Sequence, residues 1–149
     1  MDRALNILLL AFAAIFMVSC DESIPAVDVP FHIHKSCVYT GNPDKLIKMV
    51  ISSESEFNSK FTYTVAGGGG VDPVDFGSSF VVAICDVVSN EYRNIDIKYV
   101  QQKNALLYVL YTVESLGEVS YNRGASVVAS ISKDYQGLEI AFIDITGME

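Results

Sequence analysis

The chain has only two histidines, His32 and His34, and they are two residues apart in a stretch with β-strand character. Because successive side chains of a strand point to opposite faces, this spacing places both imidazole rings on the same face. Two such rings can bind a metal ion when a carboxylate from elsewhere in the chain completes the site. The sequence identifies no third ligand, so we expect surface histidines, with no metal site and no cofactor.

Three further stretches contain residue types that could do chemistry, but none has the required spacing. Ser78 follows Gly77 without the closing glycine of a Gly-x-Ser-x-Gly nucleophile elbow. The glycine run 67–70 is followed by Val-Asp-Pro, and a phosphate loop needs Gly-Lys-Ser/Thr. Asp72 and Asp75 lie outside any loop of alternating calcium ligands, and Asp75 is expected to accept backbone N–H bonds in a turn. The sequence therefore predicts no catalytic residue, and we expect the protein not to be an enzyme.

Cys20 has the most specific chemical context in the chain. It ends the segment Met17-Val18-Ser19-Cys20, which closes an apolar run over residues 7–18. This run is too short to cross a bilayer, which takes about 20 apolar residues, but it fits the apolar region of a signal peptide. The segment resembles a bacterial lipobox, whose cysteine carries a thioether-linked diacylglycerol and becomes the first residue of the mature chain. We therefore expect a lipoprotein signal peptide over residues 1–19 and lipidation of Cys20.

The residues after Cys20 bear on where the anchored protein is located. Two or more acyl chains make a lasting anchor, so the mature chain is expected to lie on one membrane face. Asp21 and Glu22 follow directly. In enteric bacteria an Asp here resembles an inner-membrane retention signal, whereas in Bacteroides-type bacteria acidic residues here resemble a signal for export to the cell surface. We expect a place in the bacterial cell envelope, at the outer membrane or cell surface rather than the inner membrane, with residues 20–30 as a tether.

The other two cysteines, Cys37 and Cys85, form an even pair in a compartment that is expected to be oxidising. A disulfide between them could therefore form. The alternative is two buried free thiols that pack as small apolar side chains. We favour the free thiols, because both cysteines lie inside strand-like runs and no spacing forces them together.

Composition restricts the class of partner. The formal net charge is −8 and the isoelectric point is about 4.6. Nucleic-acid binding needs clustered Lys and Arg, so we expect no nucleic-acid partner. The partners expected are the membrane, through the N-terminal lipid, and an envelope protein. The length left for residues 31–149 suits one domain with its own core.

The hydrophobic pattern predicts a mainly β fold. The stretch 53–56, Ser-Glu-Ser-Glu, has the form of a capping box and predicts one short helix over residues 54–60, with Phe57 and Phe61 leaning on a sheet. Runs of apolar or alternating residues separated by turn signals predict about seven strands, and 106–113 is expected to be covered on both faces. These strands are 31–39, 46–51, 80–88, 95–100, 106–113, 125–131 and 138–145. We expect an antiparallel β-sandwich or a partly open barrel, with a polar loop over 117–124.

The middle of the chain also resembles a known group of proteins. Residues 50–57, Val-Ile-Ser-Ser-Glu-Ser-Glu-Phe, resemble the opening block of a group of small, uncharacterised Bacteroides-type lipoproteins. Pro73-Val74-Asp75-Phe76 leading into 80–83 resembles their next block, and 125–137 resembles their closing segment. The group is distantly similar to the C-terminal domain of PrcB-type protease-complex subunits, which implies an antiparallel β fold. The chain departs from that domain at residues 89–92, Ser-Asn-Glu-Tyr, where many members have a Gly-Gly-Tyr-like turn.

Together these features predict a membrane-anchored bacterial lipoprotein whose folded part is a non-catalytic binding or adaptor domain. The resemblance implies an alternative, which is a protease-associated subunit or inhibitor, or an enzyme that acts on peptides. An adaptor should expose an apolar or aromatic patch, an enzyme should have a cleft with converging polar side chains, and a subunit assembled by strand addition should have an unpaired edge.

Overall fold

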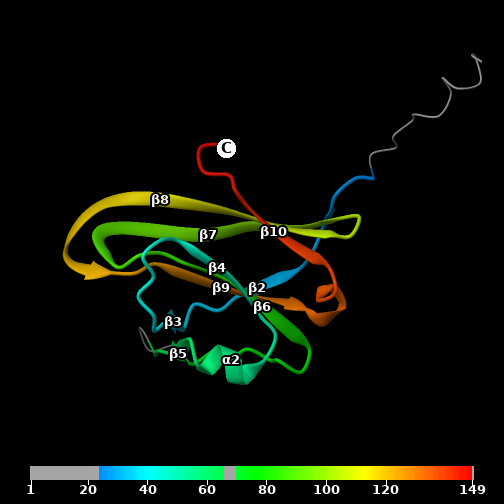
Figure 1. Cartoon of the computed structure of the whole chain (residues 1–149), viewed down its shortest axis with the longest axis horizontal. Coiled ribbons are helices and arrows are strands. Elements are labelled where there is room, and N and C mark those ends of the chain that lie inside the picture. Colours follow the sequence, from blue (N-terminus) through cyan, green and yellow to red (C-terminus); the bar gives the residue numbers. More distant parts are fainter. Residues whose placement is uncertain (1–23, 66–69, 149) are drawn as a thin grey trace, which may run out of the picture.

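The computed structural model of the chain describes residues 24–65 and 70–148. The described part is mainly β, with several antiparallel pairings and one short helix, and it does not close into a barrel (Figure 1). The predicted fold class is therefore confirmed. The expected signal peptide, Cys20, the first part of the tether and most of the glycine run lie outside the described residues.

Two four-stranded sheets form the body of the domain. The first has the strand order β1-β7-β8-β10, made of Val27–Asp28, Ser89–Lys103, Leu106–Arg123 and Glu139–Asp144. The second has the order β2-β9-β6-β4, made of Phe31–Ile33, Ser126–Ser132, Ser79–Cys85 and Ile47–Ile51. A two-stranded sheet pairs β3, Cys37–Tyr39, with β5, Phe61–Tyr63. Helix α2 spans Glu54–Asn58, and the 3-10 turn η2 spans Lys133–Tyr135.

These elements stack in three tiers, with the second sheet in the middle (Figure 1). Phe80, Val82 and Ile84 of β6 pack in a core cluster with residues of β7, β8 and β9. Side chains of a strand alternate between faces, so the intervening Val81 packs in a second cluster with Phe57 and Phe61 on the opposite face. Strand β6 is buried on both faces because each face has its own core.

The helix forms where the sequence predicts it. The Ser53 side chain accepts a hydrogen bond from the Glu56 backbone N–H, as expected of an N-cap residue. Phe57 is fully buried and its ring stacks on that of Phe61, at a centroid distance of 4.9 Å. Phe61 lies in β5 and not in the helix, which ends at Asn58. The predicted aromatic pair is therefore confirmed, but its second member belongs to a strand that the sequence pattern did not predict.

Four expectations about the strands differ from the structure. The predicted strand 31–39 is interrupted at 34–36 and contributes to two different sheets. The predicted polar loop 117–124 belongs largely to β8, which extends to Arg123 and carries a bulge near Gly117, where φ is 101°. Strand β10 pairs with β8 in parallel and not antiparallel. Within β8, Leu107 and Val109 are buried, whereas the opposite face is half-buried up to Leu110 and buried at Thr112. The strand buried on both faces along nearly all of its length is β6.

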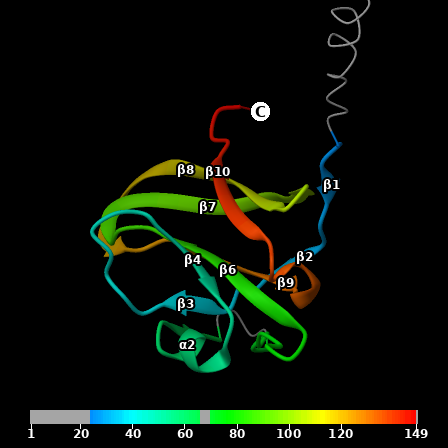
Figure 2. The same ribbon diagram turned by 45° about the vertical axis from the view of Figure 1, so that its right-hand side comes forward.

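Residues 27–29, the last part but one of the expected tether 20–30, pair with the first sheet. Val27 and Asp28 pair with Gln102 and Gln101 of β7, and the Val29 N–H donates to the Val100 carbonyl at 2.8 Å. The Val29 side chain is buried in the core. Figure 2 shows β1 lying beside the end of β7. The last residues of the expected tether are thus part of the fold, because Val29 has an apolar side chain that the core accommodates.

Candidate functional site

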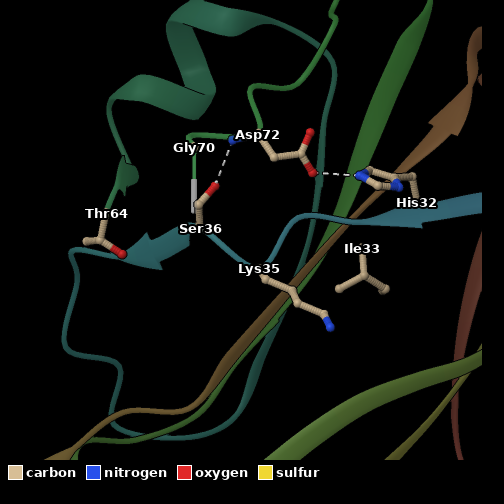
Figure 3. A pocket seen from close by; sticks show the side chains of 7 residues that line it. All are labelled: His32, Ile33, Lys35, Ser36, Thr64, Gly70 and Asp72. Atoms are coloured by element: carbon tan, nitrogen blue, oxygen red, sulfur yellow. Dashed lines mark hydrogen bonds and ion pairs between the residues drawn. The ribbon is translucent and has the colours of Figure 1, made fainter. Parts of the chain in front are cut away.

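Three side chains from two distant parts of the chain converge beside β2. The His32 Nε2–H donates to the Asp72 carboxylate oxygen Oδ2 at 2.6 Å (Figure 3). The His34 Nδ1 lies 3.4 Å from the same oxygen and 3.0 Å from the Asp72 backbone carbonyl. The two imidazole rings are edge-on to each other, with centroids 4.7 Å apart. The structure thus supplies the third group that the sequence did not identify.

Strand pairing fixes the two histidines. In the antiparallel register of β2 and β9, His32 lies opposite Ser130. The His34 backbone N–H donates to the Val128 carbonyl at 2.9 Å, which continues this pairing one step beyond β2. The side chain of His32 is 63% exposed and that of His34 is 4% exposed. The expectation of two surface histidines is therefore wrong for His34, whose ring is held between Asp72 and Ser130.

The small sheet and its surroundings hold Asp72. The Asp72 backbone N–H donates to the Ser36 hydroxyl at 3.2 Å, and Ser36 directly precedes β3. Two residues after Asp72, the Val74 N–H donates to the Tyr63 hydroxyl at 3.1 Å. The Tyr63 ring in turn contacts the buried Phe57 ring, at a centroid distance of 5.7 Å. Asp72 is therefore anchored from both sides to the layer that α2, β3 and β5 build.

The electrostatics of the cluster favour a charged carboxylate. The hydrogen bond from His32 is the largest cause that holds the pKa of Asp72 below its usual value, and the charge of His34 acts in the same direction. An ionised carboxylate can accept two or more hydrogen bonds or coordinate a cation. Asp72 is therefore available as an anionic ligand at neutral pH.

Ser130 adds a fourth polar group. Its Oγ lies 2.9 Å from the His34 Nε2, so the order Ser130, His34, Asp72 matches that of a serine-hydrolase triad. Ser130, however, lies in the middle of β9, which pairs with β2 on one side and β6 on the other. The backbone N–H groups around it belong to these ladders, so they are not directed at a reacting oxyanion. The hydroxyl therefore orients the His34 ring.

A cavity of about 430 Å³ opens beside the cluster. It is lined by His32, Ile33, Lys35, Ser36, Thr64, Gly70 and Asp72 (Figure 3). Two members of the cluster, His32 and Asp72, thus face a space large enough for water or a small ligand. The sequence contains no signal that Asp72 contacts the histidines, because Asp72 lies 40 residues after His32 and only the tertiary fold brings them together.

The other residues singled out in the sequence lie away from the cluster. The Asp75 carboxylate accepts from the Gly77 N–H at 2.8 Å and from the Ser78 hydroxyl at 2.6 Å, which confirms the predicted turn role. Cys37 and Cys85 are free thiols, both buried in the second core cluster. Burial, together with the charge of Asp72, raises the pKa of Cys37 to about 11, and burial raises that of Cys85 to about 12.

Comparisons with known proteins give no assignment: no family model, no curated protein and no solved structure matches the chain. Within residues 24–65 and 70–148, no helix has the length and apolar character needed to cross a membrane.

Proposed function

We propose that the protein is a lipid-anchored, non-catalytic binding domain of the bacterial cell envelope, at the outer membrane or cell surface. The lipobox-like segment that ends at Cys20 supports the anchor, and the anionic composition supports a partner other than nucleic acid. The folded domain begins a few residues after that cysteine, at the short strand β1.

The observation that carries the binding role is an exposed β-ribbon formed by the start of β7 and the end of β8, opposite the turn that joins the two strands. We define the distal arm as residues 114–123 of β8 together with residues 89–94 of β7, which pair with each other. Every arm residue of β8 except Val119 is exposed. Leu116 and Tyr121 are 56% and 59% exposed. None of the arm residues belongs to either core cluster. A two-stranded ribbon by itself is only marginally stable in water, so a partner that covers the exposed side of the arm would stabilise it.

The distal arm also has an open backbone edge. Pairing of β10 with β8 ends at Asp144 and Tyr111. Two residues further along β8, the Val113 backbone N–H donates to the Thr146 hydroxyl at 2.9 Å. From Glu114 onward, no strand among the described residues pairs with that side of β8. An extended segment of a partner can add to such an edge by backbone hydrogen bonds, with the exposed side chains giving selectivity.

The same edge bears on the second candidate function, a protease-associated subunit or inhibitor, or an enzyme acting on peptides. An unpaired edge can hold an extended peptide, which is what those roles would require. The position of Ser130 inside a sheet, paired on both sides, speaks against peptide cleavage at the histidine cluster. We therefore place the non-catalytic binding role first.

The anchor is tested on the protein purified from bacterial membranes. Mass spectrometry of the mature N-terminus should find Cys20 carrying a diacylglycerol, and labelling with radioactive palmitate should be lost in Cys20→Ser. A mature chain that starts elsewhere, or palmitate labelling that persists in Cys20→Ser, would contradict the anchor without bearing on the arm.

The binding role is tested by crosslinking in intact cells that express the lipidated protein. The arm variant Leu116→Lys/Tyr121→Lys should lose a crosslinked partner that the wild type captures. Val50→Lys is a matched control, because Val50 is 41% exposed on β4, which pairs with β6 and not with the arm, and it should retain the partner. Equal capture by the wild type and the arm variant would remove the arm from the interface.

A further inference from the structure

We propose that His32, His34 and Asp72 form a binding site for one divalent transition-metal ion of the Zn²⁺ type. The site is independent of the lipid anchor and of the distal arm, so neither the failure nor the success of those proposals decides it. Each of the three residues offers one ligand atom, and these atoms all lie within 4.8 Å of one another.

Two of the three distances between ligand atoms lie within about 0.7 Å of what a tetrahedral ion requires. Zn²⁺ binds imidazole nitrogen and carboxylate oxygen at about 2.0–2.2 Å, which places two tetrahedral ligands about 3.3 Å apart. The His34 Nδ1 is already 3.4 Å from the Asp72 Oδ2. The His32 Nε2 is 2.6 Å from the same oxygen because the two share a proton in a hydrogen bond. An ion that replaces this proton needs them to separate by about 0.7 Å, and both side chains are exposed enough to move.

Ser130 can hydrogen-bond to His34 in both the metal-free and the metal-bound form of the site. Without an ion, the His34 Nδ1–H donates to the Asp72 carbonyl, and the Nε2 accepts from the Ser130 hydroxyl. A metal-bound Nδ1 carries no proton, so the proton moves to Nε2 and is donated to the Ser130 Oγ. A hydroxyl can act as donor or acceptor, so it satisfies both tautomers without moving a heavy atom. Metal-binding histidines generally have such a partner on the second ring nitrogen.

The ligand types select the class of ion. Two imidazoles and one carboxylate suit Zn²⁺, Cu²⁺ or Ni²⁺, whereas Ca²⁺ and Mg²⁺ take oxygen ligands almost exclusively. The thiols of Cys37 and Cys85 do not compete, because both side chains are buried in the second core cluster. The net charge of −8 favours the approach of a cation.

The site has an open coordination position. Three protein ligands leave one tetrahedral position unfilled, and both His32 and Asp72 line the cavity of about 430 Å³. Water or a small anionic ligand from this cavity can complete the coordination, and Lys35 on the cavity wall suits an anion. This arrangement differs from closed structural zinc sites, which have four protein ligands.

The chain offers a direct readout, because it has only two histidines. The protein as expressed in bacteria is purified in detergent, stripped of metal with a chelator, and titrated with ZnCl₂. Long-range ¹⁵N spectra of the imidazole rings should show both histidines shifting together and saturating at one Zn²⁺ per chain. CaCl₂ at the same concentrations should shift neither ring. No shift up to about 1 mM Zn²⁺, or equal shifts with Ca²⁺, overturns the proposal.

Four variants locate the site, with affinity measured by calorimetry. His32→Ala and Asp72→Asn change side chains that are 63% and 48% exposed, and they should weaken Zn²⁺ binding at least tenfold. The exposed control Asp44→Asn should not change it. Ser130→Ala should weaken binding about 10- to 100-fold through the orientation of His34. Equal affinities for the wild type, His32→Ala and Asp72→Asn would place any bound Zn²⁺ elsewhere and would refute this site. None of these variants removes the buried His34, so folding is expected to be retained, and circular dichroism verifies it.

Discussion

Thr112 in β8 allows a sharp test of the packing, because replacing it with valine should stabilise the protein. The residue is 2% exposed, and among the described residues its hydroxyl has no hydrogen-bond partner. A buried polar group without a partner costs about 1–3 kcal/mol, because it loses its bonds to water and gains none in return. Valine has nearly the same shape and an equal preference for strands. We expect Thr112→Val to raise the free energy of unfolding by about 1–2 kcal/mol.

The assay is urea unfolding followed by circular dichroism. The midpoint should rise while the slope of free energy against urea stays constant, because the surface exposed on unfolding does not change. A domain of this size should gain about 3–6 °C in melting temperature for each kcal/mol.

Two controls separate the hydroxyl from the methyl group. Thr112→Ser keeps the hydroxyl and removes a buried methyl, so it should lower the stability by about 1 kcal/mol. Thr62→Val makes the same change at an exposed strand position and should stay within about 0.5 kcal/mol of the wild type. If Thr112→Val proves less stable than the wild type, the hydroxyl has a partner in solution and the reasoning fails.

Three further predictions concern the second core cluster and the histidine cluster. Phe57→Ala removes a fully buried ring that stacks on Phe61, and it should cost about 3–5 kcal/mol in urea unfolding; a loss below about 1 kcal/mol would show that α2 is not packed on the sheet. Because the pKa of Asp72 is lowered in the folded state, its contribution to stability is present above the unfolded pKa near 3.9 and is lost as the pH falls through the folded pKa. The stability difference between the wild type and Asp72→Asn should therefore be seen at pH 5–7 and shrink below about pH 3, and a difference that persists unchanged in acid would contradict this. With pKa values of about 11 and 12, Cys37 and Cys85 should resist a thiol reagent at pH 8 in folded Cys20→Ser protein and react fully in urea; fast reaction of the folded protein would place a thiol at the surface.

The sequence predicted those elements whose formation depends on residues within or next to the element itself. Ser53 and Glu56 lie three residues apart, so the helix start depends only on residues that adjoin it. The strongly apolar strand around residues 80–85 was predicted because its own residues are apolar on both faces. The mainly β class follows from such segments taken together.

The features that the sequence could not predict depend on pairing between distant segments. The outer half of β8 contains Gly117 and several polar residues, so it has the composition of a loop and is a strand only because β7 lies beside it. The parallel placement of β10 on β8 has no local signature, because its residues would fit an antiparallel neighbour equally well. The histidine cluster has the same origin: the two histidines were visible, but Asp72 reaches them only through its bonds to the layer built by β3 and β5.

If the proposed anchor is correct, the pairing of β1 with β7 limits how far the domain can lie from the membrane. Val27 is fixed in the first sheet, so under the proposed lipidation of Cys20 only residues 21–26 would connect the anchor to the fold. A fully extended chain advances at most about 3.5 Å per residue, so residues 21–26 can span at most about 20 Å. In the proposed anchored protein, the domain would be held close to the bilayer, with its N-terminal end turned toward it. A partner of such a domain would itself lie near the membrane surface, and this confinement would raise the local concentration of the two proteins without any additional contact.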